Sequence, residues 1–147
     1  MRREDVTEKV LQAKTVKNLT WSTLAKAAGR SEVWTTSALL GQQAMSHDEA
    51  AACAKLLELG AEEVAALQVP PSKGSLATTV PTDPLIYRFH EVTQVYGTTL
   101  KALIHEKFGD GIMSAIDFEL DVEKVADPKG DRVKVTMNGK FLGYRKW

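Results

Sequence analysis

An arginine and a glutamate lie three residues apart in the segment TDPLIYRFHEVTQVYGTTLKAL, residues 82–103. In a helix, Arg88 and Glu91 are one turn apart and close enough to form an ion pair. A guanidinium group carries a fixed positive charge and forked N–H donors, so a well-held arginine can bind a small anion. The pair can also be an ordinary exposed ion pair worth about 0.3 kcal/mol, and the spacing alone does not distinguish these two roles.

The residues around this pair predict a helix with two unlike sides. Asp83 suits the N-cap and Pro84 the first helical position, and the helix is expected to end near Lys107. At about 100° per residue, one apolar stripe is predicted to face a core: Leu85, Phe89, Val92, Tyr96, Leu100 and Leu103. Arg88 and Glu91 fall on the flank of this stripe, beside small and apolar residues. That position suggests that another surface covers the flank.

The other residues that could do chemistry give weaker signals. Cys53 is the only cysteine, so neither an intrachain disulfide nor a multi-cysteine zinc site can form within one chain. On one helix, His90 and His105 lie roughly 22 Å apart, which is too far to ligate one metal ion. Ser114, in GIMSAI, is expected at a boundary between a loop and a strand, and by itself it indicates no activity. The chain has no P-loop, Rossmann or G-x-S-x-G motif.

The composition indicates a globular protein without a general affinity for polyanions. The chain has 147 residues, of which 44% are hydrophobic, enough for one ordinary domain or two small ones. Its 19 basic and 19 acidic residues balance, so no overall charge draws it to nucleic acid or to an anionic membrane. The charged N-terminal segment does not resemble a signal peptide, and no apolar run approaches the roughly 18 residues of a membrane span. A cytoplasmic protein is therefore expected.

Residues 1–68 predict an all-α bundle with the outline of a helix-turn-helix. In TWSTLAKAAGRSEVWTTSALLGQ, Gly29 suits the turn and Ser31 the N-cap of the second helix. Ser46 and Glu49 form a capping box for a later helix, which is expected to stop at Gly60. The predicted recognition helix offers Glu32, Trp34 and hydroxyl residues, with Arg30 as its only nearby cation. Because DNA-binding surfaces are basic, this favours a structural bundle over a DNA-binding domain.

Residues 69–81, rich in Pro, Ser, Thr and Gly, predict a linker to a second domain over residues 82–147. After the helix, three short strands are expected near residues 116–123, 132–137 and 140–144. Asn138 and Gly139 form the favoured two-residue turn between the last two. One helix and three strands cannot bury enough surface alone, so this half is expected to associate with another copy.

The run YRFHEVTQVYGTTLKALIHEKFGDGIMSAIDFELDVEKVADPKGD strongly resembles the C-terminal domain of the cyanase (cyanate hydratase) family, and ALLGQQ anchors a looser resemblance in the first half. The resemblance implies an α+β fold. A helix-turn-helix-like bundle that does not bind nucleic acid precedes a small α+β domain that interlocks with a second subunit. Five such dimers are expected to form a decamer. The resemblance also implies that Arg88, Glu91 and Ser114 are the catalytic residues.

The activity that the resemblance implies is a lyase reaction, the bicarbonate-dependent decomposition of cyanate to ammonia and carbon dioxide through carbamate. The expected partners are cyanate, bicarbonate and further copies of the chain, with no metal, no organic cofactor, no nucleic acid and no membrane. In this reaction Arg88 would hold the anions, Ser114 would donate a hydrogen bond, and Glu91 would orient Arg88. The alternative is a helix-turn-helix DNA-binding regulator with a C-terminal dimerisation arm.

Overall fold

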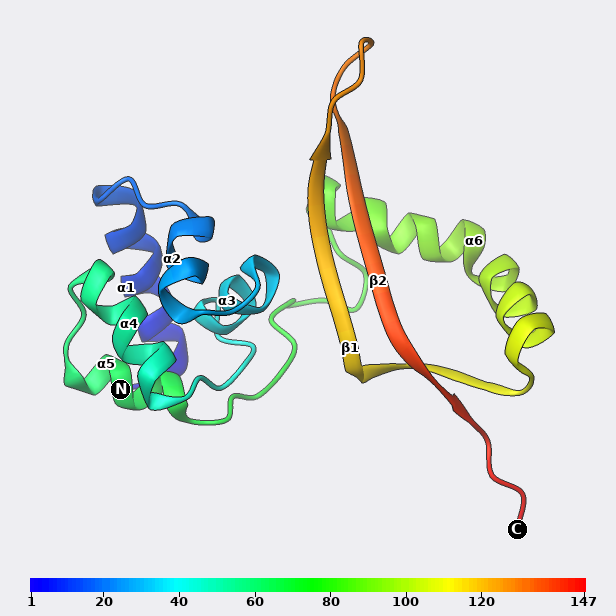
Figure 1. Cartoon of the computed structure of the whole chain (residues 1–147), viewed down its shortest axis with the longest axis horizontal. Coiled ribbons are helices and arrows are strands. Elements are labelled where there is room, and N and C mark those ends of the chain that lie inside the picture. The colour runs from blue at the N-terminus through cyan, green and yellow to red at the C-terminus, as the bar shows by residue number, and fades with distance from the viewer. The chain divides into compact units, whose positions relative to one another are not determined.

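The computed structural model describes residues 1–147 as two compact units (Figure 1). The first comprises Met1–Ser75 and Asp121–Lys124, and the second comprises Leu76–Leu120 and Val125–Trp147. Within Met1–Ser75 every regular element is a helix. The helices are α1 (Arg3–Val16), α2 (Trp21–Ala28), α3 (Glu32–Leu39), α4 (His47–Leu57) and α5 (Ala61–Gln68). Their apolar sides form one core, made of Val6, Val10, Leu24, Ala38, Leu39, Met45, Ala50, Cys53, Leu57 and Leu67.

The ends of these helices follow their local chemistry. The hydroxyls of Ser31 and Ser46 accept hydrogen bonds from amides of the first turn, and Glu49 completes the capping box with Ser46. Gly29, with φ 67°, ends α2 in the left-handed conformation that glycine adopts without strain. These features confirm the predicted turn and caps.

The predicted stop of α4 at Gly60 is wrong. The helix ends at Leu57, and Glu58 takes the left-handed conformation with φ 54°. Gly60 is instead the N-cap of α5, where its amide donates to the carboxylate of Glu63 at 2.9 Å. A glycine between two helices can serve either end, and here the acidic residue three positions later satisfies its amide.

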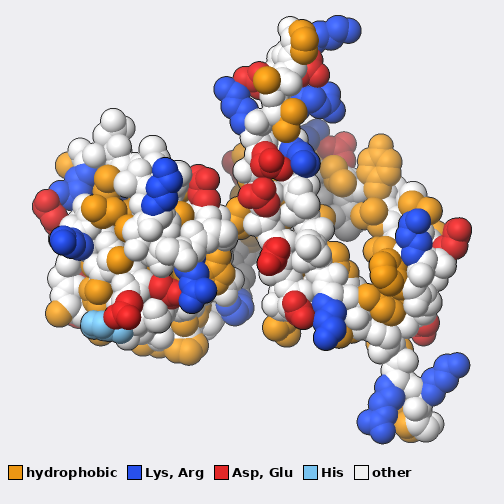
Figure 2. Space-filling model, in the orientation of Figure 1, with side chains coloured by type: hydrophobic (Ala, Val, Ile, Leu, Met, Phe, Trp, Pro, Cys, Tyr) orange, Lys and Arg blue, Asp and Glu red, His pale blue; other side chains and the backbone are white.

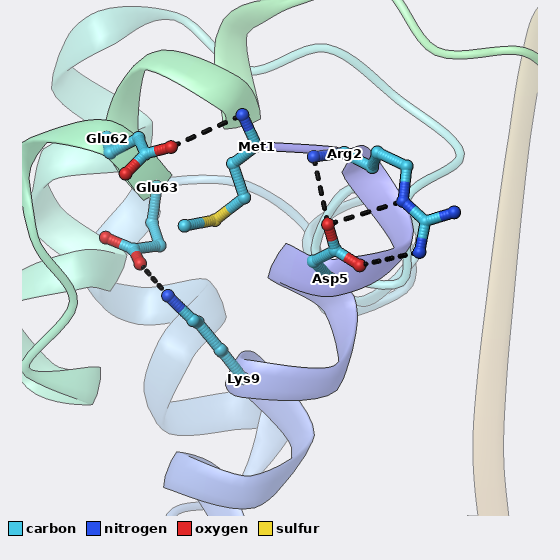
Figure 3. A network of polar contacts seen from close by, with 6 residues as sticks. All are labelled: Met1, Arg2, Asp5, Lys9, Glu62 and Glu63. Atoms are coloured by element: carbon cyan, nitrogen blue, oxygen red, sulfur yellow. Dashed lines mark hydrogen bonds and ion pairs between the residues drawn. The ribbon is translucent and has the colours of Figure 1, made fainter.

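Polar contacts tie α1 to α5. Lys9 forms an ion pair with Glu63, and the N-terminal amine lies 3.3 Å from Glu62 (Figure 3). The guanidinium of Arg3 donates to the carbonyls of Ala38 and Ala66, at 2.7 and 2.9 Å. Both carbonyls lie in the last turn of a helix, where each accepts one amide from a residue just beyond the helix, Gly41 or Val69, so Arg3 adds a second donor and caps the ends of α3 and α5 together.

The second unit consists of one long helix and one hairpin. α6 (Pro84–Phe108) begins at Asp83, whose carboxylate accepts hydrogen bonds from the amides of Leu85 and Ile86. The hairpin pairs β1 (Gly111–Val125) with β2 (Arg132–Gly143). Near the C-terminal end of α6, the ring of Phe108 stacks on that of Phe141 with 5.0 Å between centroids. None of the helices is both long and apolar enough to cross a membrane.

The predicted third strand is wrong, because Asn138 and Gly139 form no turn. They lie inside β2, which runs unbroken to Gly143. Gly139 is required for another reason: a Cβ at this position would overlap the backbone oxygen of Ser114 and the side chain of Met113. β1 also begins earlier than expected, so Ser114 lies within a strand and not at its boundary.

The apolar stripe of α6 is exposed in the single chain, and Figure 2 shows hydrophobic side chains over this helix. Leu85 is 68% exposed and Leu100 48%, so the prediction that the stripe is buried is wrong for one chain. Two strands that contact the helix near one end cannot cover its full length. Ile116 of β1, at 99%, is also fully exposed.

Candidate active site

Arg88 and Glu91 lie in the first half of α6 and form the predicted ion pair. Nη1 of Arg88 lies 2.8 Å from Oε2 of Glu91, and Nε donates to the carbonyl of Pro84 at 3.3 Å. The guanidinium carbon is also 5.5 Å from the centre of the Tyr87 ring. These contacts hold the guanidinium against its own helix while leaving other N–H donors for a ligand. The two side chains are 62% and 46% exposed in the single chain.

Ser114 is buried, and its hydroxyl oxygen accepts two hydrogen bonds. The amides of Ile116 and Asp117 donate to Oγ at 3.0 and 2.9 Å. Successive amides of a regular strand point to opposite edges, so two consecutive amides that reach one oxygen require a local irregularity in β1. Because two amides occupy the lone pairs of the oxygen, the hydroxyl proton remains free for donation to another acceptor.

Arg88 and Ser114 do not meet within one chain. Arg88 lies about 25 Å along the helix from His105. The ring of His105 lies 3.4 Å from the carbonyl of Gly111, the first residue of β1. The start of the strand is therefore at the opposite end of α6 from Arg88, and no hydrogen bond or ion pair joins Ser114 to Arg88 or Glu91.

Arg30, the cation nearest to the predicted recognition helix, is already engaged in an ion pair. Nε of Arg30 lies 2.5 Å from Oε1 of Glu49, whose other oxygen accepts the backbone amide of Ser46 at 2.8 Å. The Ser46 amide, with the Arg30 guanidinium, holds the pKa of Glu49 below its usual range. Arg30 therefore braces α2 and α3 against α4.

Cys53 is not poised for nucleophilic chemistry. Its thiol is fully buried and lies 3.6 Å from the carbonyl of Leu24. Burial raises the pKa of the thiol to about 11, so almost no thiolate is present near neutral pH. No cluster of His, Cys, Asp and Glu side chains in the chain has the arrangement of a metal site.

One cavity of the first unit, about 700 Å³, contains none of the predicted site residues. It lies between α1, the end of α3 and residues 69–75, with Arg3, Glu4 and Gln42 in its lining. Lys73 holds the chain over this region by donating to the carbonyl of Gln42 and the side chain of Gln43.

The residues that support Ser114 were missed from the sequence. Its partners are backbone amides of the following residues, which no side-chain pattern reveals. Gly139, directly opposite, did give a signal. A glycine inside an alternating strand marks either a turn or a close approach of another backbone, and the second applies here.

Comparisons with known proteins cover almost the whole chain. A family model described as the cyanate lyase C-terminal domain matches residues 78–146, and one described as the N-terminal part of cyanate hydratase matches residues 3–71. The cyanate hydratases of Thiobacillus denitrificans and Ralstonia pickettii are 58% and 57% identical over 147 residues, 100% of both chains. The crystal structure of cyanase from T. urticae is similar with a TM-score of 0.83 and 40% identity, over 94% of this chain and 96% of that one.

Proposed function

The chain belongs to the cyanate lyase family, and we propose on that premise that it decomposes cyanate with bicarbonate as co-substrate. The observation that carries the proposal is the full-length match to proteins named cyanate hydratase. The presence of Arg88, Glu91 and Ser114 at the positions that the family resemblance assigns to catalysis supports it further.

Between heavy atoms, the proposed reaction forms one bond and breaks two. A bicarbonate oxygen attacks the electrophilic carbon of cyanate, and the cyanate nitrogen takes up protons. The C–O bond within the former bicarbonate then breaks, which releases carbon dioxide and leaves carbamate. Carbamate takes up one more proton and separates into ammonia and a second carbon dioxide. Each turnover thus consumes one cyanate, one bicarbonate and two protons.

The main obstacle to this reaction is the mutual repulsion of two anions. The fixed charge and forked donors of Arg88 can hold one or both of them at the distance needed for attack. The 2.8 Å contact with Glu91 supports a role for that carboxylate in orienting the guanidinium, since a carboxylate would repel the substrates directly. Ser114, with its proton free, can donate to an oxygen or nitrogen that gains charge. These effects require no metal ion or organic cofactor.

We propose that the site is completed between copies of the chain. Arg88 and Ser114 lie at opposite ends of α6, and the exposed stripe of that helix offers a large apolar surface for association. Interlocked second units would form dimers, and five dimers a decamer, in which several copies of Arg88 and Ser114 enclose one small positive pocket. We assign the enzyme to the cytoplasm, a reducing compartment that suits its free Cys53.

The test is ammonia formation from cyanate with and without bicarbonate. Purified full-length chain is expected to release ammonia only when bicarbonate is present. With ¹³C-labelled bicarbonate, half of the carbon dioxide produced in the first turnovers should carry the label, because one of the two molecules from each turnover derives from cyanate. Ammonia release that ignores bicarbonate would refute the mechanism. Salt-dependent binding to duplex DNA without turnover would favour a DNA-binding regulator.

A further inference from the structure

We infer that Gly139 is a positioning residue for Ser114, an inference that rests on the proposed function. Gly139 itself touches no substrate. Its lack of a side chain lets β2 approach β1 closely where β1 carries Ser114. That approach fixes the backbone from which the hydroxyl is presented.

Of the two glycines of β2, only Gly139 lies this close to β1, and Gly111 of β1 lies equally close to Leu142 of β2. A Cβ at Gly139 would overlap the backbone oxygen of Ser114 and lie 2.5 Å from Cγ of Met113. A Cβ at Gly143, in the same strand, would meet only ordinary contacts, at 3.7 Å from the ring of Phe141 and 3.8 Å from the oxygen of Asp110. Glycine in a strand interior weakens the strand. At position 139, the close pairing of β1 and β2 that glycine permits offsets this loss of stability.

The geometry of Ser114 makes its function sensitive to this pairing. Its oxygen is held by the amides of Ile116 and Asp117, both within 3.0 Å. The free O–H must point away from these two amides, so its direction is set by the backbone of β1. A side chain at position 139 would press on the backbone carbonyl oxygen of Ser114, not on Oγ, and would shift that backbone. The hydroxyl would then no longer face the substrate at hydrogen-bonding distance.

The experiment compares Gly139→Ala with Gly143→Ala in the full-length enzyme. Both variants add one methyl group to the same strand, but only the first lacks room for it. We expect Gly139→Ala to lower kcat by about 100-fold, the scale of an ångström of misplacement. Gly143→Ala should retain wild-type kcat. Equal activity in the two variants, or wild-type activity in Gly139→Ala, overturns the inference. A Gly139→Ala chain that does not fold also overturns it, because residue 139 would then maintain the hairpin as a whole.

Hydrogen exchange tests the inference independently of the activity of the variant and of whether the variant folds. In the unmodified enzyme the amides of Ile116 and Asp117 should exchange slowly although Ile116 is 99% exposed in the single chain. In Gly139→Ala, faster exchange should be confined to the segment around Ser114. Fast exchange of these amides in the unmodified enzyme, or faster exchange throughout the variant, overturns the inference. If the unmodified enzyme does not consume cyanate, the proposed function is refuted. The exchange rates still show whether Gly139 maintains the backbone that holds Ser114.

Discussion

A single 2.8 Å contact joins the guanidinium of Arg88 to the carboxylate of Glu91, one turn apart on α6. Because both side chains are largely exposed in the single chain, the contact itself adds at most about 1 kcal/mol to stability. If the pair serves only as a surface ion pair, removing it should hardly change the protein. If it organises an anion site, removal should abolish turnover at little cost in stability. The two roles are therefore separable by experiment.

Replacement of Arg88 tests the anion-binding role. We expect Arg88→Leu to abolish turnover and Arg88→Lys to lower kcat by at least about 100-fold, because lysine keeps the charge but loses the forked donors. Assembly measured by sedimentation should be largely unchanged in both. Lys101→Leu, another exposed cation of α6, is the matched control and should remain active. Full activity of Arg88→Leu would refute the assigned role.

Replacement of Glu91 tests whether it orients Arg88. Glu91→Leu removes both the charge and the acceptor, so turnover should fall clearly. Glu91→Gln keeps an acceptor for the guanidinium and should recover part of the lost kcat. Steady-state kinetics with cyanate and bicarbonate varied separately would measure both effects. Unchanged kinetics in Glu91→Leu would leave the pair as a surface ion pair.

The helix boundaries were predictable where one side chain satisfies the free amides of a first turn. Asp83, Ser31 and Ser46 all cap the helices that the sequence predicted. Glycine was less reliable. Gly29 ends a helix as expected, but Gly139 was interpreted as a turn residue although it permits close contact between two strands. Both uses of glycine exploit the missing Cβ, and the local sequence does not distinguish them.

The candidate site was only partly predictable from residue spacing. The ion pair of Arg88 and Glu91 follows directly from their separation on a helix. Ser114 was identified by family resemblance alone, since its hydrogen bonds come from backbone amides in an irregular strand. The apolar stripe of α6 was predicted to face a core, and this is wrong for one chain, because no surface of the same chain covers the stripe.

A charge placed on the exposed stripe of α6 tests association between copies. Leu100 is exposed in the single chain and would be buried in the proposed assembly. Leu100→Lys should therefore convert the assembly to smaller species, because burial of a lysine without a partner is strongly unfavourable. Turnover should fall with assembly if the site is shared between copies. Val16→Lys, at a residue of α1 that is 79% exposed, is the control and should leave both unchanged. Size-exclusion chromatography with light scattering would report the species. An intact, active assembly of Leu100→Lys would contradict a shared site at this surface.

The carboxylate of Glu49 should make the first unit sensitive to acid. The Ser46 amide and the Arg30 guanidinium lower the pKa of Glu49 in the folded state. The contribution of Glu49 to stability is therefore fully present above the pKa of the unfolded state, about 4.5, and is lost as the pH falls through the lower pKa of the folded state. Glu49→Gln should lower the Tm at pH 7, and its difference from the wild type should shrink steadily below about pH 4.5. Glu8→Gln, an exposed change in the interior of α1, is the control and should leave the Tm unchanged. Circular dichroism melts from pH 3 to pH 7 would measure this, and a Tm difference independent of pH would show that the charge of Glu49 is not its cause.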